Sequence, residues 1–268
     1  MNAPPFAEPA LLTDLAVAAE RAGWDAFLLW DHMVIDRGGV PIVDPWVTLG
    51  AAAARTERIR VGTCVTPLAR RRPHKLARET VTLDNLSAGR LVLGVGLGHP
   101  ADEYSTFGEN ADLTVRAAVT DEALTVLAGL WSGELFEHDG EYFHVESVRF
   151  LPTPVQRPRP PVWVACVLPS RRAIARAARW DGIVPIKVGA SGIEFLTPDD
   201  IEGIVSEVRQ RRGTLDQFDV VVNPGPPPTA SVSAYEAAGA TWWLTSMDNF
   251  PGWFEELRHI VESGPPRG

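Results

Sequence analysis

Side chains that could move a proton stand where two predicted strands end. Asp31 and His32 directly follow the apolar run 24–30, which has the length and composition of a buried strand. His99 follows the glycine-rich turn 96–98, which closes another such run. An imidazole titrates near neutral pH, so either histidine could donate or accept a proton beside a bound ligand. The alternative for each is a ring that is simply hydrogen-bonded within the structure.

The other strand ends carry small or polar groups rather than carboxylates. Cys64-Val65-Thr66, Gly96-Leu97-Gly98 and Ala165-Cys166 each close a predicted strand. Neither cysteine has a base beside it in the sequence, and a free cysteine is most often a small buried hydrophobe. Glycines let a flat ring lie against main chain, although a bare turn explains them equally well. These strand ends therefore favour holding a cofactor over hydrolysis.

Three cationic groups could meet an anion. Ser170-Arg171-Arg172 opens a predicted helix directly after a strand, where free N–H groups, the helix dipole and two guanidinium groups favour a phosphate. Arg70-Arg71-Arg72 is either a solvated face or a second phosphate contact. Lys187 could form a Schiff base if burial lowered its pKa, but contact with a phosphate or carboxylate is the simpler interpretation.

The elements that position these groups alternate between strand and helix. Predicted strands cover 24–30, 59–65, 90–95, 162–166, 182–186, 218–222 and 241–245. Predicted helices cover 11–22, 46–56, 73–86, 101–107, 112–130, 170–180, 201–212, 231–238 and 250–261. This pattern predicts a (β/α)8 TIM barrel whose first strand is missing or reduced to residues 2–6. An open doubly wound sheet is the alternative.

Two segments depart from the alternation. Residues 131–160 predict a hairpin around Asp139-Gly140, followed by an extended, proline-rich connector. Residues 187–196 predict a loop between a strand and the next helix.

Composition narrows the class of protein. The chain has 268 residues, which suits a single barrel domain over 1–268, and its net charge of −9 argues against nucleic acid or an anionic membrane as partner. No run approaches the roughly 18 apolar residues of a membrane span, and no secretory signal precedes Pro4. No cluster of His, Asp or Glu has the spacing of metal ligands. Because two cysteines cannot form a disulfide framework, we expect a protein of the reducing cytoplasm.

Seven stretches of the sequence are specific for one protein family through their order and spacing, although none of them is diagnostic by itself. They are AERAGWDAFLLWDHM (19–33), DPWVTLGAAAARTERIRVGTCVTPL (44–68), RRPHKLARETVTLDNLSAGRLVLGVGLG (71–98), DEYSTFG (102–108), LWSGELFEHDGEYF (130–143), LPTPVQRPRPPVWV (151–164) and ARAARWDGIVP (175–185). Through them the chain resembles the bacterial luciferase-like oxidoreductases, particularly the branch that uses the deazaflavin coenzyme F420.

This resemblance implies a TIM barrel with an insertion after its fourth unit, here 131–160, and a cofactor at the carboxyl ends of the strands. It implies that Asp31 and His32 contact the cofactor ring and that Cys64-Val65 forms a bulge, often a non-prolyl cis peptide, behind it. The turn 96–98 would lie at the ring edge, with His99 where F420-dependent dehydrogenases can carry an acidic group.

The sequence also departs from the family's pattern. The phosphate loop would fall near 166–172, where Ala165-Cys166 stands in place of the usual Gly-Gly. The first strand is nearly absent. Unpaired edges beside it suggest a homodimer, or a start that lies further upstream.

The resulting prediction is an oxidoreductase that transfers hydride to or from a small organic substrate, or inserts oxygen into it, with F420 favoured over FMN. The predicted catalytic residues are Asp31, His32 and His99. The predicted cofactor-binding residues are Asp31, His32, Cys64, Val65, Thr66, Gly96, Leu97, Gly98, His99, Cys166, Ser170, Arg171, Arg172 and Lys187.

A flavin or F420 reductase could be a partner of this enzyme. Two other classes stay open. One is a flavin-binding protein of the same fold without turnover, and the other is a Schiff-base aldolase that uses Lys187.

Overall fold

The computed structural model describes residues 2–3, 8–35, 39–189, 192–225, 228–245 and 253–266. Its main sheet contains β1 (Asn2–Ala3), β2 (Ala26–Leu29), β3 (Arg60–Pro67), β4 (Leu91–Gly96), β7 (Val162–Leu168), β8 (Gly182–Gly189), β9 (Gly192–Glu194), β10 (Asp219–Val222) and β11 (Trp242–Trp243). Helices that surround it are α1 (Pro9–Ala22), α2 (Pro45–Arg55), α3 (Pro73–Leu86), α4 (Asp102–Ser105), α5 (Leu113–Trp131), α6 (Arg171–Ala177), α7 (Pro198–Arg212), α8 (Val232–Ala237) and α9 (Trp253–Ser263). A 3-10 turn, η2 (Leu68–Arg70), follows β3.

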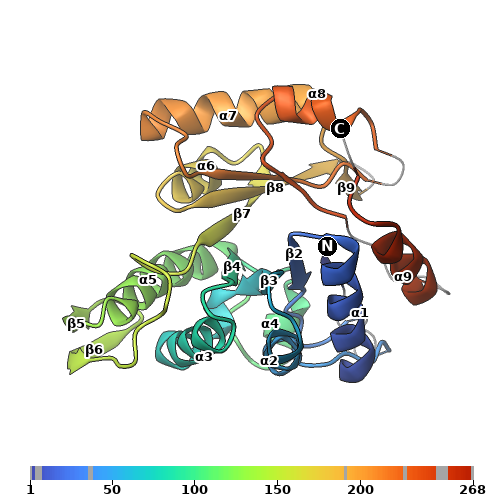
Figure 1. Ribbon diagram of the computed structural model, residues 1–268. Coiled ribbons are helices and arrows are strands. Elements are labelled where there is room, and N and C mark those ends of the chain that lie inside the picture. Colours follow the sequence, from blue (N-terminus) through green and yellow to red (C-terminus); the bar gives the residue numbers. More distant parts are fainter. Residues whose placement is uncertain are drawn as a thin grey trace.

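The sheet is curled and its strands follow one another in chain order. The order is β1-β2-β3-β4-β7-β8-β10-β11, and every neighbouring pair along it is parallel (Figure 1). A doubly wound sheet reverses its strand order at a switch point, so this sequential order excludes that alternative. The predicted TIM-barrel-like α/β fold is confirmed, in the form of a half-barrel within the described part of the chain.

The first strand is present but very short. β1 pairs with β2 through Asn2 opposite Leu28 and Ala3 opposite Leu29. The prediction of a first strand reduced to residues 2–6 is therefore confirmed for residues 2–3, while residues 4–6 lie outside the described residues.

Local signals in the sequence explain where helices begin and end. The Asp44 side chain accepts a hydrogen bond of 2.9 Å from Val47 N and caps α2, whose first residue is Pro45. Thr197 and Asp200 form a reciprocal capping box at the start of α7. Gly23 ends α1 with φ of 90°, a conformation that favours glycine.

Two apolar layers lie on opposite faces of the sheet. The outer layer joins alternate strand residues to the helices, as Leu93 on β4 and Leu124 on α5 illustrate. The inner cluster contains strand-end and strand residues alone: Ala26, Leu28, Cys64, Val92, Trp163, Val184, Val221 and Leu244. Since side chains alternate along a strand, membership of a cluster shows which face a residue occupies.

The insertion after β4 and α5 is a hairpin of β5 (Leu135–Asp139) and β6 (His144–Arg149), as predicted. The Glu122 carboxylate on α5 fixes it by accepting hydrogen bonds from Tyr142 N, Phe143 N and His138 Nε2. A Cβ on Gly140 would lie 2.0 Å from Oε1 of Glu122, so a larger residue at the tip would have to displace this carboxylate.

Two sequence predictions need correction outside this insertion. The loop predicted over 187–196 contains β9, which pairs antiparallel with β8. A polar, glycine-containing segment predicts a loop, but β8 extends beyond its short pairing with β10, and the edge left open there supplies hydrogen-bond partners that no local pattern reveals. Helix α9 ends at Ser263, two residues beyond its predicted end, while residues 250–252 of the predicted span lie outside the described residues.

The helices that the structure describes include none that is both long enough and apolar enough to cross a membrane.

Candidate functional site

The carboxyl ends of the first strands bring several predicted residues to one end of the half-barrel. Thr66 on β3 lies opposite Val95 on β4, and β2 runs beside β3 in the same direction. A Cβ on Gly96 would lie 2.8 Å from Val65 Cγ2 and 3.4 Å from Ala165 Cβ, so the ends of β3, β4 and β7 meet here. The prediction of a shared site therefore has a geometric basis for these three strands.

The Asp31 side chain is fully buried within this end of the sheet. Its carboxylate accepts hydrogen bonds from Arg71 Nη2 at 2.6 Å and Trp46 Nε1 at 3.4 Å, and Arg70 Nη2 lies 3.5 Å away. With 0% of the side chain exposed, Asp31 supports the neighbouring guanidinium groups. This differs from the expectation that Asp31 contacts a cofactor ring directly.

His32 remains accessible, with 25% of its side chain exposed. Its Nδ1 lies 3.0 Å from Oε1 of Glu103, which follows β4 and belongs to α4. The same Glu103 oxygen accepts hydrogen bonds from Met33 N at 3.0 Å and Val34 N at 3.1 Å. The imidazole is thus anchored at Nδ1 and presents Nε2 as its other ring nitrogen.

Arg70 joins the two carboxylates of this end. Its Nη1 donates to Glu103 Oε2 at 2.8 Å, and its Nη2 donates to the backbone carbonyl of Asp31. Only 3% of the Arg70 side chain is exposed. The interpretation of Arg70 as part of a solvated face is wrong, and its charge is already balanced by Glu103 and Asp31.

Burial raises the pKa of Glu103, but hydrogen bonds from His32 and Val34 N and the charges of His32 and Arg70 outweigh it. The net result is a pKa below the usual value of a glutamate, so the carboxylate stays ionised near neutral pH.

The conformation of the turn 96–98 is fixed by the side chains that pack against it and bond to its carbonyls. Gly98 has φ of 83°, and a Cβ there would lie 2.6 Å from the Tyr104 hydroxyl. Tyr104 Oη donates to Leu97 O at 2.9 Å, while Arg116 donates to Gly98 O at 2.7 Å. Close contact with Val65 and Tyr104 therefore accounts for both glycines of the turn. His99, next in the chain, is exposed at the rim.

The bulge after β3 matches what the resemblance implied. The Cys64–Val65 peptide bond is cis, and the register of β3 against β4 shifts between Thr63 and Thr66. Burial raises the pKa of the Cys64 thiol to about 12. The Thr66 hydroxyl is buried and donates to Thr63 Oγ1 at 2.9 Å. Cys64 and Val65 thus present an apolar wall to the inner face, whereas the Thr66 side chain is already bonded.

The residues predicted to bind the cofactor after β7 do not share one environment. Cys166 belongs to the outer layer, so its side chain points toward the helices, and burial raises its pKa to about 12. Ser170 caps α6 by accepting from Ala173 N at 3.3 Å. Arg171 and Arg172 are exposed at the start of that helix. The two arginines are therefore open to solvent, whereas the Cys166 side chain faces the helices.

Lys187 forms an ion pair at the end of β8. Its Nζ lies 3.0 Å from Asp200 Oδ2, and this hydrogen bond raises the pKa of Lys187. A Schiff-base lysine needs a lowered pKa, since only the neutral amine attacks a carbonyl. The Lys187–Asp200 ion pair therefore argues against the aldolase alternative, and it occupies the ammonium group that was predicted to contact a cofactor.

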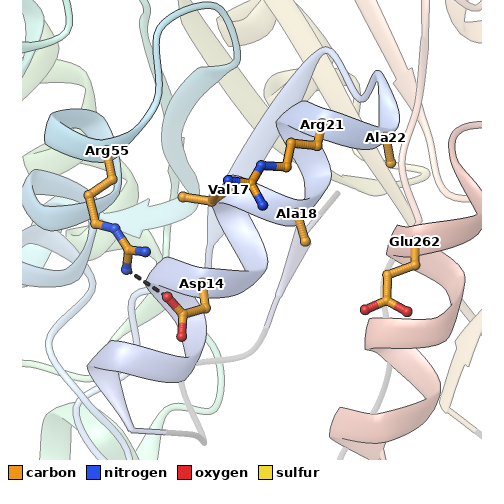
Figure 2. Close-up of a pocket in the computed structure, with 7 residues that line it drawn as sticks. All are labelled: Asp14, Val17, Ala18, Arg21, Ala22, Arg55 and Glu262. Atoms are coloured by element: carbon orange, nitrogen blue, oxygen red, sulfur yellow. Dashed lines mark hydrogen bonds and ion pairs between the residues drawn. The ribbon is translucent and has the colours of Figure 1, made fainter.

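A cavity of about 480 Å³ lies elsewhere, between α1, α2 and α9. Figure 2 shows Asp14 on α1 paired with Arg55 on α2, with Glu262 on α9 across the opening. Its lining includes none of the predicted site residues. The Asp14–Arg55 pair is more than half exposed, so solvent screens its charges and the groove has no desolvated reactive group.

Glu103 is the residue that the sequence analysis missed. It lies within the stretch 102–108, but α4 has four residues and shows no periodicity that would indicate which side chain turns inward. The signal available in the sequence was an acidic pair, Asp102-Glu103, shortly after a strand end that already carried a histidine.

Comparison with known proteins shows which family the chain resembles. The model of the luciferase-like monooxygenase family matches residues 2–243. The F420-dependent glucose-6-phosphate dehydrogenase of Nakamurella multipartita is 37% identical over 220 residues, which are 80% of this chain and 62% of that protein. The oxygenase component of the flavin-dependent trigonelline monooxygenase of Acinetobacter baylyi is 29% identical over 69% of this chain and 51% of that protein.

A solved structure shows the same fold. An F420-dependent secondary alcohol dehydrogenase, in complex with an F420–acetone adduct, has a TM-score of 0.75, with 98% of each chain covered and 16% identity. The chain spans between about half and two thirds of the length of the two curated relatives. Since the family model covers most of the chain and the fold agrees, this chain belongs to the luciferase-like monooxygenase family.

Proposed function

We propose that this chain is an F420-dependent oxidoreductase that acts on a small organic substrate beside His32. The observation that carries the proposal is a partly exposed imidazole, anchored on a buried carboxylate, at the carboxyl ends of a curled parallel sheet. In folds of this type, ligands bind at the carboxyl ends of the strands.

The residues present fit a planar ring with a charged tail. The inner face offers an apolar wall that includes Cys64, Val65 and Val184. Arg171 and Arg172 are exposed at the end of β7, where guanidinium groups suit a phosphate. Arg70 Nε and Arg71 Nε, beside Asp31, are buried without a hydrogen-bond partner among the described residues, so this end of the sheet holds two donors that its own side chains leave unsatisfied.

When bound, F420 supplies a ring that exchanges a hydride with a substrate carbon. The protein's own part is to hold the proton that accompanies the reaction. His32 Nε2 can take a proton from a substrate hydroxyl, because Nδ1 is occupied by Glu103. Val65 and its neighbours would exclude water from one side of the ring. His99 stays a candidate for a second proton-transfer group at the rim.

F420 is favoured over FMN by the relatives. The 37% identical dehydrogenase is named for F420, whereas the 29% identical oxygenase component is flavin-dependent. If FMN is the cofactor, the protein would act as an oxygenase component and need a separate reductase to supply reduced flavin. A substrate hydroxyl or carbonyl fits His32 in the F420 case.

Binding experiments test the cofactor assignment. Purified protein is titrated separately with F420 and FMN, and ring fluorescence and its polarisation are followed. We expect saturable F420 binding that weakens roughly tenfold in the double variant Arg171→Ala/Arg172→Ala, a loss of about 1.4 kcal/mol. The matched control is Arg58→Ala/Arg209→Ala, which removes two exposed charges outside the strand ends that carry the site. Equal losses in both double variants, or no saturable F420 binding, would contradict the proposal.

Turnover separates an enzyme from a flavin-binding protein. The F420-loaded protein is offered glucose 6-phosphate and 2-propanol, and loss of the oxidised cofactor's absorbance is recorded. Reduction that depends on either compound and is lost in His32→Ala supports catalysis. Binding without any reduction favours the non-catalytic alternative.

A further inference from the structure

A single buried carboxylate, that of Glu103, gathers the groups around the exposed imidazole. It accepts hydrogen bonds from His32 Nδ1, Met33 N, Val34 N and Arg70 Nη1, at distances between 2.8 and 3.1 Å. Only 1% of its side chain is exposed. The Glu103 carboxylate therefore does not reach a ligand itself, and its influence has to pass through a neighbour.

An ionised carboxylate only accepts hydrogen bonds, so His32 Nδ1 must carry the hydrogen in the 3.0 Å contact. In the neutral ring this leaves Nε2 with a free lone pair. The two backbone N–H donors of Met33 and Val34 bind the same oxygen, which fixes the carboxylate and with it the plane of the ring. The arrangement selects one tautomer of the imidazole and one direction for it.

The carboxylate of Asp31, although adjacent in the chain, cannot orient the His32 ring. Asp31 precedes His32 in the chain, but its oxygens are taken by Arg71 and Trp46 and its side chain is fully buried. Arg70 lies between the two acids and bonds to both residues. The acid that serves His32 thus comes from 71 residues away rather than from the adjacent position.

We propose that Glu103 is the positioning residue of the site, holding His32 with hydrogen on Nδ1 so that Nε2 receives the substrate proton. In that step the substrate O–H bond breaks, an N–H bond forms at Nε2, and the electron pair stays on the substrate oxygen. The imidazolium that results faces the Glu103 carboxylate, which stabilises its charge. This inference rests on the proposed function and adds to it the origin of the proton acceptor's orientation.

The chain contains a matched control for this proposal. Glu122 also accepts hydrogen bonds from a histidine, His138, and from two consecutive backbone N–H groups, those of Tyr142 and Phe143. It ties the hairpin to α5, outside the carboxyl ends of the strands. Its histidine is bound through Nε2 rather than Nδ1, so the two rings should show opposite tautomers.

The first test needs no cofactor or substrate. Ring ¹⁵N chemical shifts of a histidine-labelled chain report which nitrogen carries hydrogen in the neutral rings. We expect hydrogen on Nδ1 in His32 and on Nε2 in His138. Glu103→Ala should remove the Nδ1 preference of His32 alone, and Glu122→Ala should change His138 alone. Hydrogen on His32 Nε2 in the native chain, or a His32 tautomer indifferent to Glu103→Ala, overturns the proposal.

The second test uses variants close to the native shape, in case Glu103→Ala does not fold. Glu103→Gln should lower kcat by roughly 100-fold with the compound that is turned over, the range of a lost general base. KM and the dissociation constant for F420 should stay within about twofold, because Glu103 does not contact either ligand. Glu103→Asp, which keeps the charge, should recover part of kcat.

Glu122→Gln provides the comparison for these rates. It loses the same charge and the same kind of contact, so a general structural effect would lower kcat equally in both glutamine variants. Such equality overturns the positioning role. If F420 does not bind at all, the proposed function fails, whereas the His32 tautomer in the unliganded chain still decides the role of Glu103.

Discussion

The carboxylate of Asp31 lies 2.6 Å from Nη2 of Arg71, and the Asp31 side chain has no exposed surface. Nη2 of Arg70, of which 3% is exposed, lies 3.5 Å from an oxygen of the same carboxylate. Two guanidinium groups next to His32 are therefore partnered by the buried charge of Asp31, and Arg70 also pairs with Glu103. Breaking such a pair leaves a charge in the interior without compensation, which costs much more than the pair contributes.

Asp31→Asn should lower the free energy of unfolding by about 3–5 kcal/mol, measured by urea denaturation. The comparison is Asp14→Asn, which breaks the exposed pair with Arg55 and should cost less than about 1 kcal/mol. Similar losses in the two variants would show that Asp31 and Arg71 do not form a buried pair in solution.

Gly96→Ala tests the contact between the ends of β3 and β4. The added methyl would lie 2.8 Å from Val65 Cγ2, so the variant should lose about 1–3 kcal/mol of stability. Val65→Ala in the same chain should recover part of this loss, as a double-mutant cycle would measure. Gly50→Ala in α2 meets no atom within 4 Å and should instead stabilise by up to about 1 kcal/mol. A neutral Gly96→Ala would contradict the close packing.

The sequence alone predicts much of the candidate site, because parallel strands bring their carboxyl ends together. Asp31-His32, Cys64-Val65 and the turn 96–98 were found in this way, since each follows an apolar run. It could not show that Asp31 turns inward to Arg71 while His32 turns outward. Adjacent residues at a strand end differ in direction, and only their partners determine which one meets solvent.

Contacts between residues that are far apart in the sequence could not be predicted. Glu103 approaches His32 across 71 residues from a four-residue helix, and β9 forms on an edge that no sequence period marks. Arg70 lies in a run of three arginines that is typical of a solvent-exposed face, yet its side chain is buried because it pairs with Asp31 and Glu103. The hydrophobic pattern of a sequence does not show which polar side chains are buried, because their burial depends on the partners with which they pair.

Acidification should destabilise the protein. The pKa values of Glu20, Glu103, Glu122 and Asp200 all lie below their ordinary values, mainly because hydrogen bonds to the ionised forms outweigh burial. The unfolded chain then binds more protons than the native one in this range. Stability is therefore present above the ordinary values of 4.5 for glutamate and 3.8 for aspartate and is lost as pH falls through the native values.

Urea midpoints measured from about pH 7 to about pH 3 should fall steadily below about pH 5. Glu103→Gln should flatten this fall, because one of the four groups no longer titrates. A midpoint that rises on acidification would contradict the hydrogen bonds assigned to these carboxylates.

Both cysteines should be inert in the native protein. Burial raises the pKa of Cys64 and of Cys166 to about 12, and the thiolate is the reactive form. Mass spectrometry after iodoacetamide treatment near neutral pH should show no alkylation, while both thiols should react in urea. Rapid labelling of native Cys64 would show that the inner wall is open to solvent.

If the cofactor binds against the inner face beside His32, the signals of that imidazole must change when the cofactor binds. F420 is added stepwise to the histidine-labelled chain while the ring ¹⁵N signals of all six histidines are followed. We expect saturable shifts for His32, with smaller ones for His99, and none for His138 or His144 of the hairpin. Saturable binding that leaves the His32 signals unchanged would contradict it.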